Sequence, residues 1–173
     1  MRRVRMYHTN VETSERFFPE ICTTHTCEDK KTEIRLVKEA RLEVCSGGIL
    51  GMGETWQDRL DMALLLAELK VDSIPLNFLI PIPSTPLEHR EKLKPDEIVR
   101  IVAIFRYINP TADIRMVAGR SYFENSGEIL FRAGANATLT GDMLTTVVNN
   151  TKQDREMMAN MGYHLKEAKV QEA

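Results

Sequence analysis

One stretch of the sequence brings together residue types that could bind a metal ion or a phosphate group. The segment VCSGGILGMGE, residues 44–54, places Cys45 at the end of an apolar run and directly before closely spaced glycines. Three interpretations fit such a segment: a glycine loop that cradles phosphate, a metal site built on the thiolate, or a tight turn from a strand into a helix.

The spacing of the glycines argues against phosphate binding. Counted from Gly48 the pattern is G-x-x-G-x-G, not the G-x-G-x-x-G of dinucleotide-binding loops, and no G-K-[ST] ending follows. Glycines also adopt the positive φ angles that sharp turns require. We therefore expect the glycines to build a turn and Cys45 to be the residue with a chemical role.

The cysteines do not form a known disulfide or metal framework. There are three, Cys22, Cys27 and Cys45, and their spacing matches neither a zinc ribbon nor a ferredoxin loop. An odd number of cysteines also argues against a set of disulfides. For any one cysteine taken alone, a free and partly buried thiol is the simpler interpretation.

Polar residues gather at the carboxyl ends of the predicted strands. In a parallel barrel these ends converge on one face, which is where active sites form. The alternative is that they only cap the following helices or, for Arg115, form an ion pair at the barrel mouth. The residues concerned are Asn10, Glu12, Cys45, Asn77, Arg115, Thr145 and Thr146.

The positions of apolar residues predict the elements that hold these side chains. Strands are expected at residues 2–8, 41–48, 73–82, 113–117 and 136–140, and helices at 28–40, 55–70, 94–108, 128–134 and 152–162. In the helix at 55–70 the apolar residues recur at three- and four-residue steps, at Trp56, Leu60, Ala63, Leu64 and Ala67. In the helix at 94–108 they lie on one face, at Ile98, Ile101, Val102 and Phe105. Alternating strands and helices predict a parallel α/β sheet, either half of a (βα)₈ barrel or most of a doubly wound sheet.

Composition and charge narrow the class of protein. The 173 residues suit one domain or part of a larger one, and a 43% hydrophobic and 28% charged composition is ordinary for a globular protein. A net charge of -2 gives no reason to expect a nucleic-acid or membrane-surface partner. Because no apolar run approaches the roughly 18 residues of a membrane span and no secretory signal begins the chain, we expect a cytoplasmic location.

Four segments taken together resemble biotin synthase, a radical S-adenosylmethionine enzyme. They are YHTNVETSERFFPEICTTHT (7–26), VCSGGILGMGET (44–55), DSIPLNFLIPIPSTPL (72–87), and IRMVAGR (114–120) with AGANATLTGDMLTT (133–146). They follow the family's order and span nearly the whole chain. The resemblance implies that residues 1–173 form the C-terminal half of a (βα)₈ barrel.

The resemblance also implies that another part of the enzyme is needed. The family's N-terminal half carries a C-x-x-x-C-x-x-C loop that binds a [4Fe–4S] cluster, and this spacing is absent from the sequence. We therefore expect a truncated or split gene product. Its partner would be the missing N-terminal half or, in a homodimer, a second copy of the chain.

The resemblance assigns ligands of a second cluster, a [2Fe–2S], to Cys45 and Arg115, with the other two ligands in the missing half. A guanidinium that keeps its proton is a weak ligand, which suits a cluster that gives up its sulfur. The resemblance assigns no catalytic acid or base to this half. For S-adenosylmethionine it implies Asn10, Glu12, Lys30 (at the methionine carboxylate) and Ile80, and for dethiobiotin His8, Asn10, Asn77, Thr145 and Thr146.

Four residues depart from the family's pattern. His8 replaces an asparagine, Lys30 an arginine, Cys27 a tyrosine, and Arg41 a glycine that ends a helix. Lysine keeps the charge of arginine but loses its two-pronged fork. An arginine in a left-handed helix cap costs on the order of 1 kcal/mol. These departures suggest a divergent member of the family or a half-gene under relaxed selection.

The function implied by the resemblance is radical insertion of sulfur into dethiobiotin to form biotin. A non-catalytic half-barrel, or a subunit that needs a separate N-terminal half, is the alternative from a different class. An open half-barrel would leave two sheet edges unpaired. A related radical enzyme that acts on another small molecule is a third reading, which the histidine at position 8 leaves open.

Overall fold

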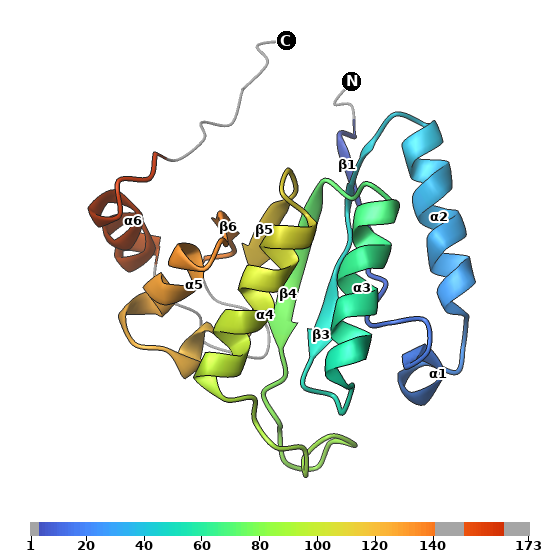
Figure 1. Cartoon of the computed structure of the whole chain (residues 1–173), viewed down its shortest axis with the longest axis horizontal. Coiled ribbons are helices and arrows are strands. Elements are labelled where there is room, and N and C mark those ends of the chain that lie inside the picture. The colour runs from blue at the N-terminus through green and yellow to red at the C-terminus, as the bar shows by residue number, and fades with distance from the viewer. Residues whose placement is uncertain (1–3, 141–150, 165–173) are drawn as a thin grey trace.

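The computed structural model describes residues 4–140 and 151–164. Within them the strands form one parallel sheet in the order β1-β2-β4-β5-β6, and β3 also pairs with β4 (Figure 1). The strands are β1 (Met6–His8), β2 (Glu43–Cys45), β3 (Gly48–Leu50), β4 (Ser73–Phe78), β5 (Asp113–Met116) and β6 (Ala137–Thr138). Cys45 lies opposite Ser73 and Gly48 opposite Leu76, so β2 and β3 are two parts of one interrupted strand.

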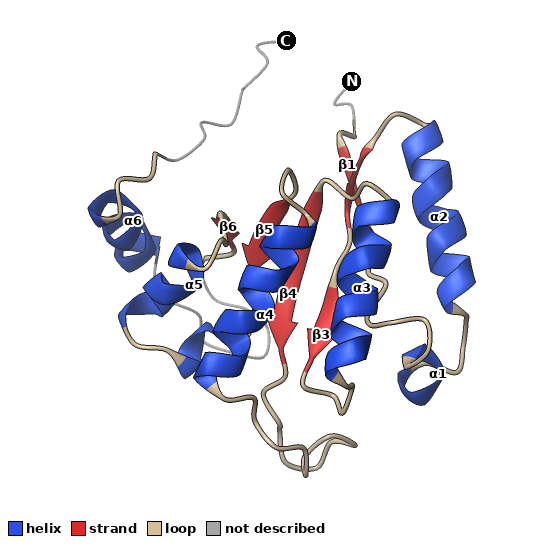
Figure 2. Cartoon of the chain, viewed as in Figure 1, coloured by secondary structure: helices blue, strands red, loops and turns tan. Residues whose placement is uncertain are grey.

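The helices of the described residues are α1 (Phe18–Ile21), α2 (Cys27–Glu39), α3 (Trp56–Glu68), α4 (Pro95–Ile108), α5 (Glu128–Arg132) and α6 (Thr151–Asn160), with short 3₁₀ turns η1 (Arg120–Tyr122) and η2 (Asn125–Gly127). Of these, α2, α3 and α4 connect consecutive strands and lie on the same face of the sheet (Figure 2). Right-handed crossovers between strands whose order never reverses place α2, α3 and α4 on one face. A doubly wound sheet reverses its strand order, so this topology is that of a half-barrel.

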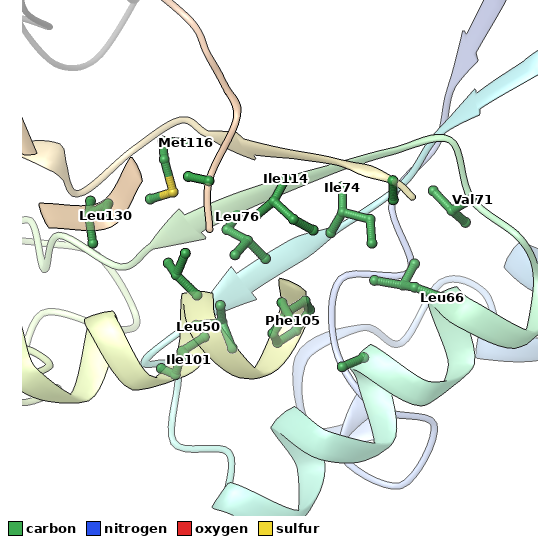
Figure 3. Packing of buried hydrophobic residues seen from close by; sticks show 14 of the residues in the cluster. Leu50, Leu66, Val71, Ile74, Leu76, Ile101, Phe105, Ile114, Met116 and Leu130 are labelled. Atoms are coloured by element: carbon green, nitrogen blue, oxygen red, sulfur yellow. The ribbon is translucent and has the colours of Figure 1, made fainter. Parts of the chain in front are cut away.

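The core lies between the sheet and these helices. Along β4 and β5 every second side chain, including Ile74, Leu76 and Ile114, is fully buried against the helices (Figure 3). Burial of each such side chain contributes roughly 1.5–3 kcal/mol. Alternation along a strand leaves the intervening residues on the opposite face. That opposite face is the barrel-interior face, and it carries the predicted site.

Local signals fix where several helices begin and end. Thr26 and Asp29 form a capping box at the start of α2, and Thr55 and Asp58 form one at the start of α3. Such reciprocal bonds satisfy amides that a helix leaves unpaired. After α2 the chain passes through Arg41 at φ 58°, which confirms the left-handed position expected there.

The apolar face predicted for α4 is buried, whereas the helically spaced apolar residues of α3 are only partly buried. In α4, Ile98, Ile101, Val102 and Phe105 are all buried, as expected. In α3 the buried residues are Asp58, Arg59, Met62, Ala63 and Leu66, whereas Trp56 and Leu64 are exposed. Apolar residues occur almost all around this helix, so their spacing does not choose a face. The capping box and the buried Arg59 determine which face of α3 is buried.

Some elements were not expected from the sequence. The short helix α1, the strand β3 and the two 3₁₀ turns were missed, and the strand predicted at 136–140 is formed only by Ala137–Thr138. In the described residues, no helix is both long and apolar enough to span a membrane.

Candidate functional site

The interior face of the sheet brings together Cys45 of β2, Ser73 and Asn77 of β4, and Arg115 of β5. Cys45 pairs with Ser73, and Arg115 pairs with Pro75, two residues further along β4. Because side chains alternate along a strand, residues two apart share a face. The polar residues predicted at the carboxyl ends of these strands therefore do lie on one face.

Cys45 is a buried thiol, with only 5% of its surface exposed. Burial raises the pKa of this thiol, while a hydrogen bond with Ser73 and the positive charge of Arg115 oppose the rise. The thiolate is the form that acts as a nucleophile or a metal ligand. Binding a metal ion would deprotonate the thiol, so Cys45 could serve as a metal ligand in spite of its burial.

Arg115 lacks the ion pair that was the alternative explanation for it. Within residues 4–140 and 151–164 its side chain forms no salt bridge, and its Nε is buried with no hydrogen-bond partner. An unpaired buried polar atom costs about 1–3 kcal/mol, so this Nε fits a site completed by a further polar or metal group.

Two amides of the site are bound to the glycine segment. The Asn10 side chain accepts a hydrogen bond from the Gly47 amide at 3.1 Å, and the Asn77 side chain donates to the Gly48 carbonyl at 3.2 Å. Both amides are partly buried. The glycine segment thus fixes the orientation of two predicted substrate contacts.

Glu12 lies beside the same glycines in an unusual backbone conformation. Its φ is 64°, and it forms an isolated parallel bridge with Gly48. Burial raises the pKa of the Glu12 carboxyl, while Asn10, Lys30 and the nearby histidines lower it. Glu12 is therefore a partly buried carboxyl group with cationic residues around it.

The remaining predicted site residues are placed less centrally. His8 is exposed and pairs with Cys45 in the sheet, so it shares the interior face. Ile80 is partly buried just after β4. Lys30, on the first turns of α2, donates a hydrogen bond to the Thr9 hydroxyl at 3.2 Å. Thr145 and Thr146 lie outside the described residues.

The glycines do build a turn, but they have two different physical roles. Gly51 and Gly53 have φ angles of 97° and 116°, which favour glycine. At Gly47 and Gly48 the constraint is space, since a Cβ would lie 2.0 Å from a backbone oxygen of Pro75 or Glu12 respectively. This confirms the turn interpretation and adds a close approach that the spacing alone did not indicate.

Glu54 binds the backbone amides that a phosphate group would need as hydrogen-bond donors. Its carboxylate accepts hydrogen bonds from the amides of Gly51, Met52 and Gly53 at 2.8–3.2 Å, and from Arg59 at 2.8 Å. Glu54 was not among the site residues predicted from the sequence. A glutamate directly after a glycine turn, with an arginine five positions later, is the signal that could have found it.

Sequence reasoning also missed Ser73 and Ile49. Ser73 opposes Cys45, and Ile49 opposes Asn77 in the β3–β4 register, so both belong to the interior face. Counting every second residue from Asn77 would have found Ser73. Ile49 is only partly buried and offers an apolar surface beside the Asn77 amide.

A groove of about 570 Å³ lies at the opposite, amino-terminal ends of the strands, lined by residues such as Lys38, Asp72 and Thr111. We assign this groove no role in the chemistry, because the predicted site residues lie toward the carboxyl ends of the strands. Within the described residues, no three His, Cys, Asp or Glu side chains form a metal-binding group.

Fold and site together define half of a parallel α/β barrel, with a buried thiol and a guanidinium on its interior face. Residues 75–164 match the model of the Biotin and Thiamin Synthesis associated domain, and the chain belongs to that family. It is 60% identical over 162 residues to a biotin synthase of Alkaliphilus metalliredigens and 59% identical to one of Clostridium beijerinckii. In both comparisons the match covers 94% of this chain and 51% of the relative.

The chain thus spans about half the length of the curated relatives it matches, and corresponds to their C-terminal half. Among solved structures it is similar to an HMG-CoA lyase from Brucella melitensis, with a TM-score of 0.60 at 13% identity. That alignment covers 92% of this chain and 59% of the lyase. At this identity the likeness shows the fold alone, and it agrees with half of a (βα)₈ barrel.

Proposed function

We propose that this chain forms the sulfur-donor and substrate side of a biotin synthase, which inserts sulfur into dethiobiotin. The observation that carries the proposal is the shared interior face of Cys45 and Arg115, in a chain closely similar to biotin synthases. When bound, S-adenosylmethionine supplies a 5′-deoxyadenosyl radical and a [2Fe–2S] cluster supplies the sulfur. The radical-generating [4Fe–4S] cluster would be held outside this chain.

The residues present fit one edge of a cluster site. Cys45 offers a thiolate, the usual protein ligand of iron–sulfur clusters. Arg115 offers a buried Nε that has no partner among the described residues. Both lie on a face that a completed barrel would shield from water. Because only these two ligands come from this chain, the remaining ligands would come from the rest of the barrel.

The other residues of the face suit a ureido ring and a nucleoside. Asn77 and Asn10 are held in fixed orientations by the glycine segment, and an amide can both donate to and accept from the ring. We assign His8, Thr145 and Thr146 to the same substrate. Glu12 would accept hydrogen bonds from the ribose hydroxyls of S-adenosylmethionine, Ile80 would contact its adenosine part, and Lys30 would bind its carboxylate.

A second candidate function rests on the edges of the sheet. Within the described residues β1 pairs only with β2, and β6 pairs only with β5. Such edges suit a subunit that pairs with a separate N-terminal half, or with a second copy of the chain as a homodimer. A non-catalytic half-barrel would have the same unpaired edges. Enzymatic activity of the chain once it is paired with an N-terminal half would distinguish a catalytic subunit from a non-catalytic half-barrel.

The experiment that tests the proposal replaces Cys45 in the assembled enzyme. Cys45→Ala is expected to remove the [2Fe–2S] share of the iron and its visible absorption, because the thiolate is the strongest ligand that this chain offers. Cys22→Ala serves as the matched control, since Cys22 lies in the turn before α2 and bonds Thr24 and His25. Unchanged iron content and spectrum in Cys45→Ala would contradict the proposal.

A further inference from the structure

Lys30 and Lys31 are adjacent on α2 but have different surroundings. The Nζ of Lys31 lies 2.6 Å from a carboxylate oxygen of Glu15 and 2.9 Å from one of Glu28. Lys31 therefore forms ion pairs with two carboxylates, and only 12% of its side chain is exposed. Because its ammonium is paired within the chain, Lys31 is a useful comparison for Lys30.

Lys30 is held more loosely and by a different set of groups. Its Nζ lies 3.6 Å from a Glu33 oxygen and donates a hydrogen bond to the Thr9 hydroxyl at 3.2 Å. Its side chain is 22% exposed. The Glu33 carboxylate lies beyond the usual hydrogen-bond distance from the Lys30 ammonium, so the two groups attract each other mainly through their charges.

Two hydroxyl groups occupy the carboxylate of Glu33. Tyr7 donates to one oxygen and Thr9 to the other, each at 2.7 Å. The Thr9 hydroxyl has one hydrogen, which goes to Glu33, so it must accept from Lys30. The bonds from Tyr7 and Thr9 lower the pKa of the Glu33 carboxyl, with Tyr7 contributing most. The result is a hydrogen-bond chain with a fixed direction, from Lys30 through Thr9 to an ionised Glu33.

We propose that Glu33 is a positioning residue, which through Thr9 fixes the Lys30 ammonium beside the carboxyl end of β1 as the anchor for a ligand carboxylate. An ammonium group has three donors, and Thr9 takes only one of them. The inference deepens the proposed function and rests on it, because the carboxylate concerned is that of S-adenosylmethionine. The positive charge of Lys30 also lowers the pKa of the Glu12 carboxyl, a residue proposed to bind the same ligand.

Glu33 also explains why lysine suits position 30 in this chain. An arginine there would present a planar fork that matches a carboxylate with two parallel bonds. Glu33 would then compete with the ligand for the guanidinium. The two residues therefore act as a unit, and Lys30→Arg alone is expected to weaken ligand binding. The double variant Lys30→Arg with Glu33→Gln is expected to recover it.

The contact itself can be tested on the whole chain, with or without cofactors. Lysines are acylated with an N-hydroxysuccinimide ester of acetic acid, and the rate at each position is read by peptide mass spectrometry. Glu33→Gln should raise the rate at Lys30 several-fold and leave Lys31 unchanged, since the amine must leave Thr9 and Glu33 to react. Glu15→Gln is the matched control and should affect Lys31 instead. An unchanged rate at Lys30 in Glu33→Gln would overturn the positioning role.

The role toward the ligand is tested in the assembled, cluster-loaded enzyme by equilibrium dialysis of S-adenosylmethionine and by kinetics. Glu33→Gln should weaken S-adenosylmethionine binding by about tenfold and raise its KM more than it lowers kcat. Tighter binding by Glu33→Gln would mean that Glu33 sequesters Lys30, and the inference would be wrong. If the wild-type enzyme bound no S-adenosylmethionine, the proposed function would fail together with the ligand assigned to Lys30. The acylation rates would still report the Glu33 contact.

Discussion

Gly48 shows how a single residue can set the spacing of the whole site. A Cβ at this position would lie 2.0 Å from the Glu12 carbonyl oxygen, while the same backbone segment holds Asn77. Any side chain would push β3 away from the segment that follows β1. The residue is therefore required by the close approach of two backbones.

We predict that Gly48→Ala lowers the free energy of unfolding by about 2–3 kcal/mol, because the added methyl group meets backbone that cannot move aside. The control is Gly162→Ala, where φ is also unfavourable at 77° but no atom lies within 4 Å of the new methyl group. That control should cost only about 1 kcal/mol. Urea denaturation of both variants measures the difference, and equal losses would show that crowding at Gly48 is relieved elsewhere.

At the scale of elements, the start of α3 depends on one buried carboxylate. Asp58 accepts hydrogen bonds from the hydroxyls of Ser14 and Thr55, each at 2.6 Å, and from Arg16 at 2.8 Å. Burial alone would raise the pKa of Asp58, but these bonds outweigh it and hold the pKa well below its usual range. The ionised carboxylate thus joins α3 to the segment that follows β1.

A lowered pKa in the folded state has a defined consequence for acid stability. The unfolded chain takes up the Asp58 proton near pH 4, before the folded chain does, so the contribution is present above that pH and is lost as the pH falls further. Asp58→Asn should cost about 1–3 kcal/mol at pH 7 and flatten the loss of stability between pH 5 and pH 3. Urea denaturation at each pH, with Asp61→Asn as the control on the same helix, measures this. An unchanged pH profile in Asp58→Asn would contradict the assignment.

The sequence predicted those elements whose local signals agree with their packing. In α4 the apolar stripe and Pro95 agree on where the helix begins and which face is buried, and the structure confirms both. In α3 nearly every face is apolar, and the buried face follows from Arg59 and Asp58, which bond to the distant residues Glu97 and Ser14. Cys45 and Arg115 could be placed on one face from strand alternation. The bonds of Asn10 and Asn77 to the glycines could not, because they depend on tertiary contacts between segments.

At the scale of the whole molecule, the sheet ends in two strands that each pair on one side only within the described residues. We predict that the 173 residues alone form no biotin, since only two of the proposed cluster ligands, Cys45 and Arg115, lie in them. Adding an N-terminal half-barrel that carries a C-x-x-x-C-x-x-C loop should give a stable complex and restore activity. Size-exclusion chromatography with light scattering and a biotin assay test both statements. Biotin formed by the chain alone, with S-adenosylmethionine and a reductant, would refute the prediction.

The buried guanidinium of Arg120 connects three elements at once. It donates to the Asp154 carboxylate of α6 at 2.5 and 3.1 Å, to the Thr138 hydroxyl of β6 at 2.7 Å, and to the Ser126 carbonyl in η2. Asp154 and Arg120 are both almost completely buried.

This arrangement makes α6 a cooperative unit whose opening has its own free energy. Separating Asp154 from Arg120 would leave two buried charges unpaired, so the helix cannot leave the sheet gradually. Amide hydrogens along α6 should therefore exchange with solvent together, at a rate set by the rupture of one ion pair rather than by fraying from the end of the helix.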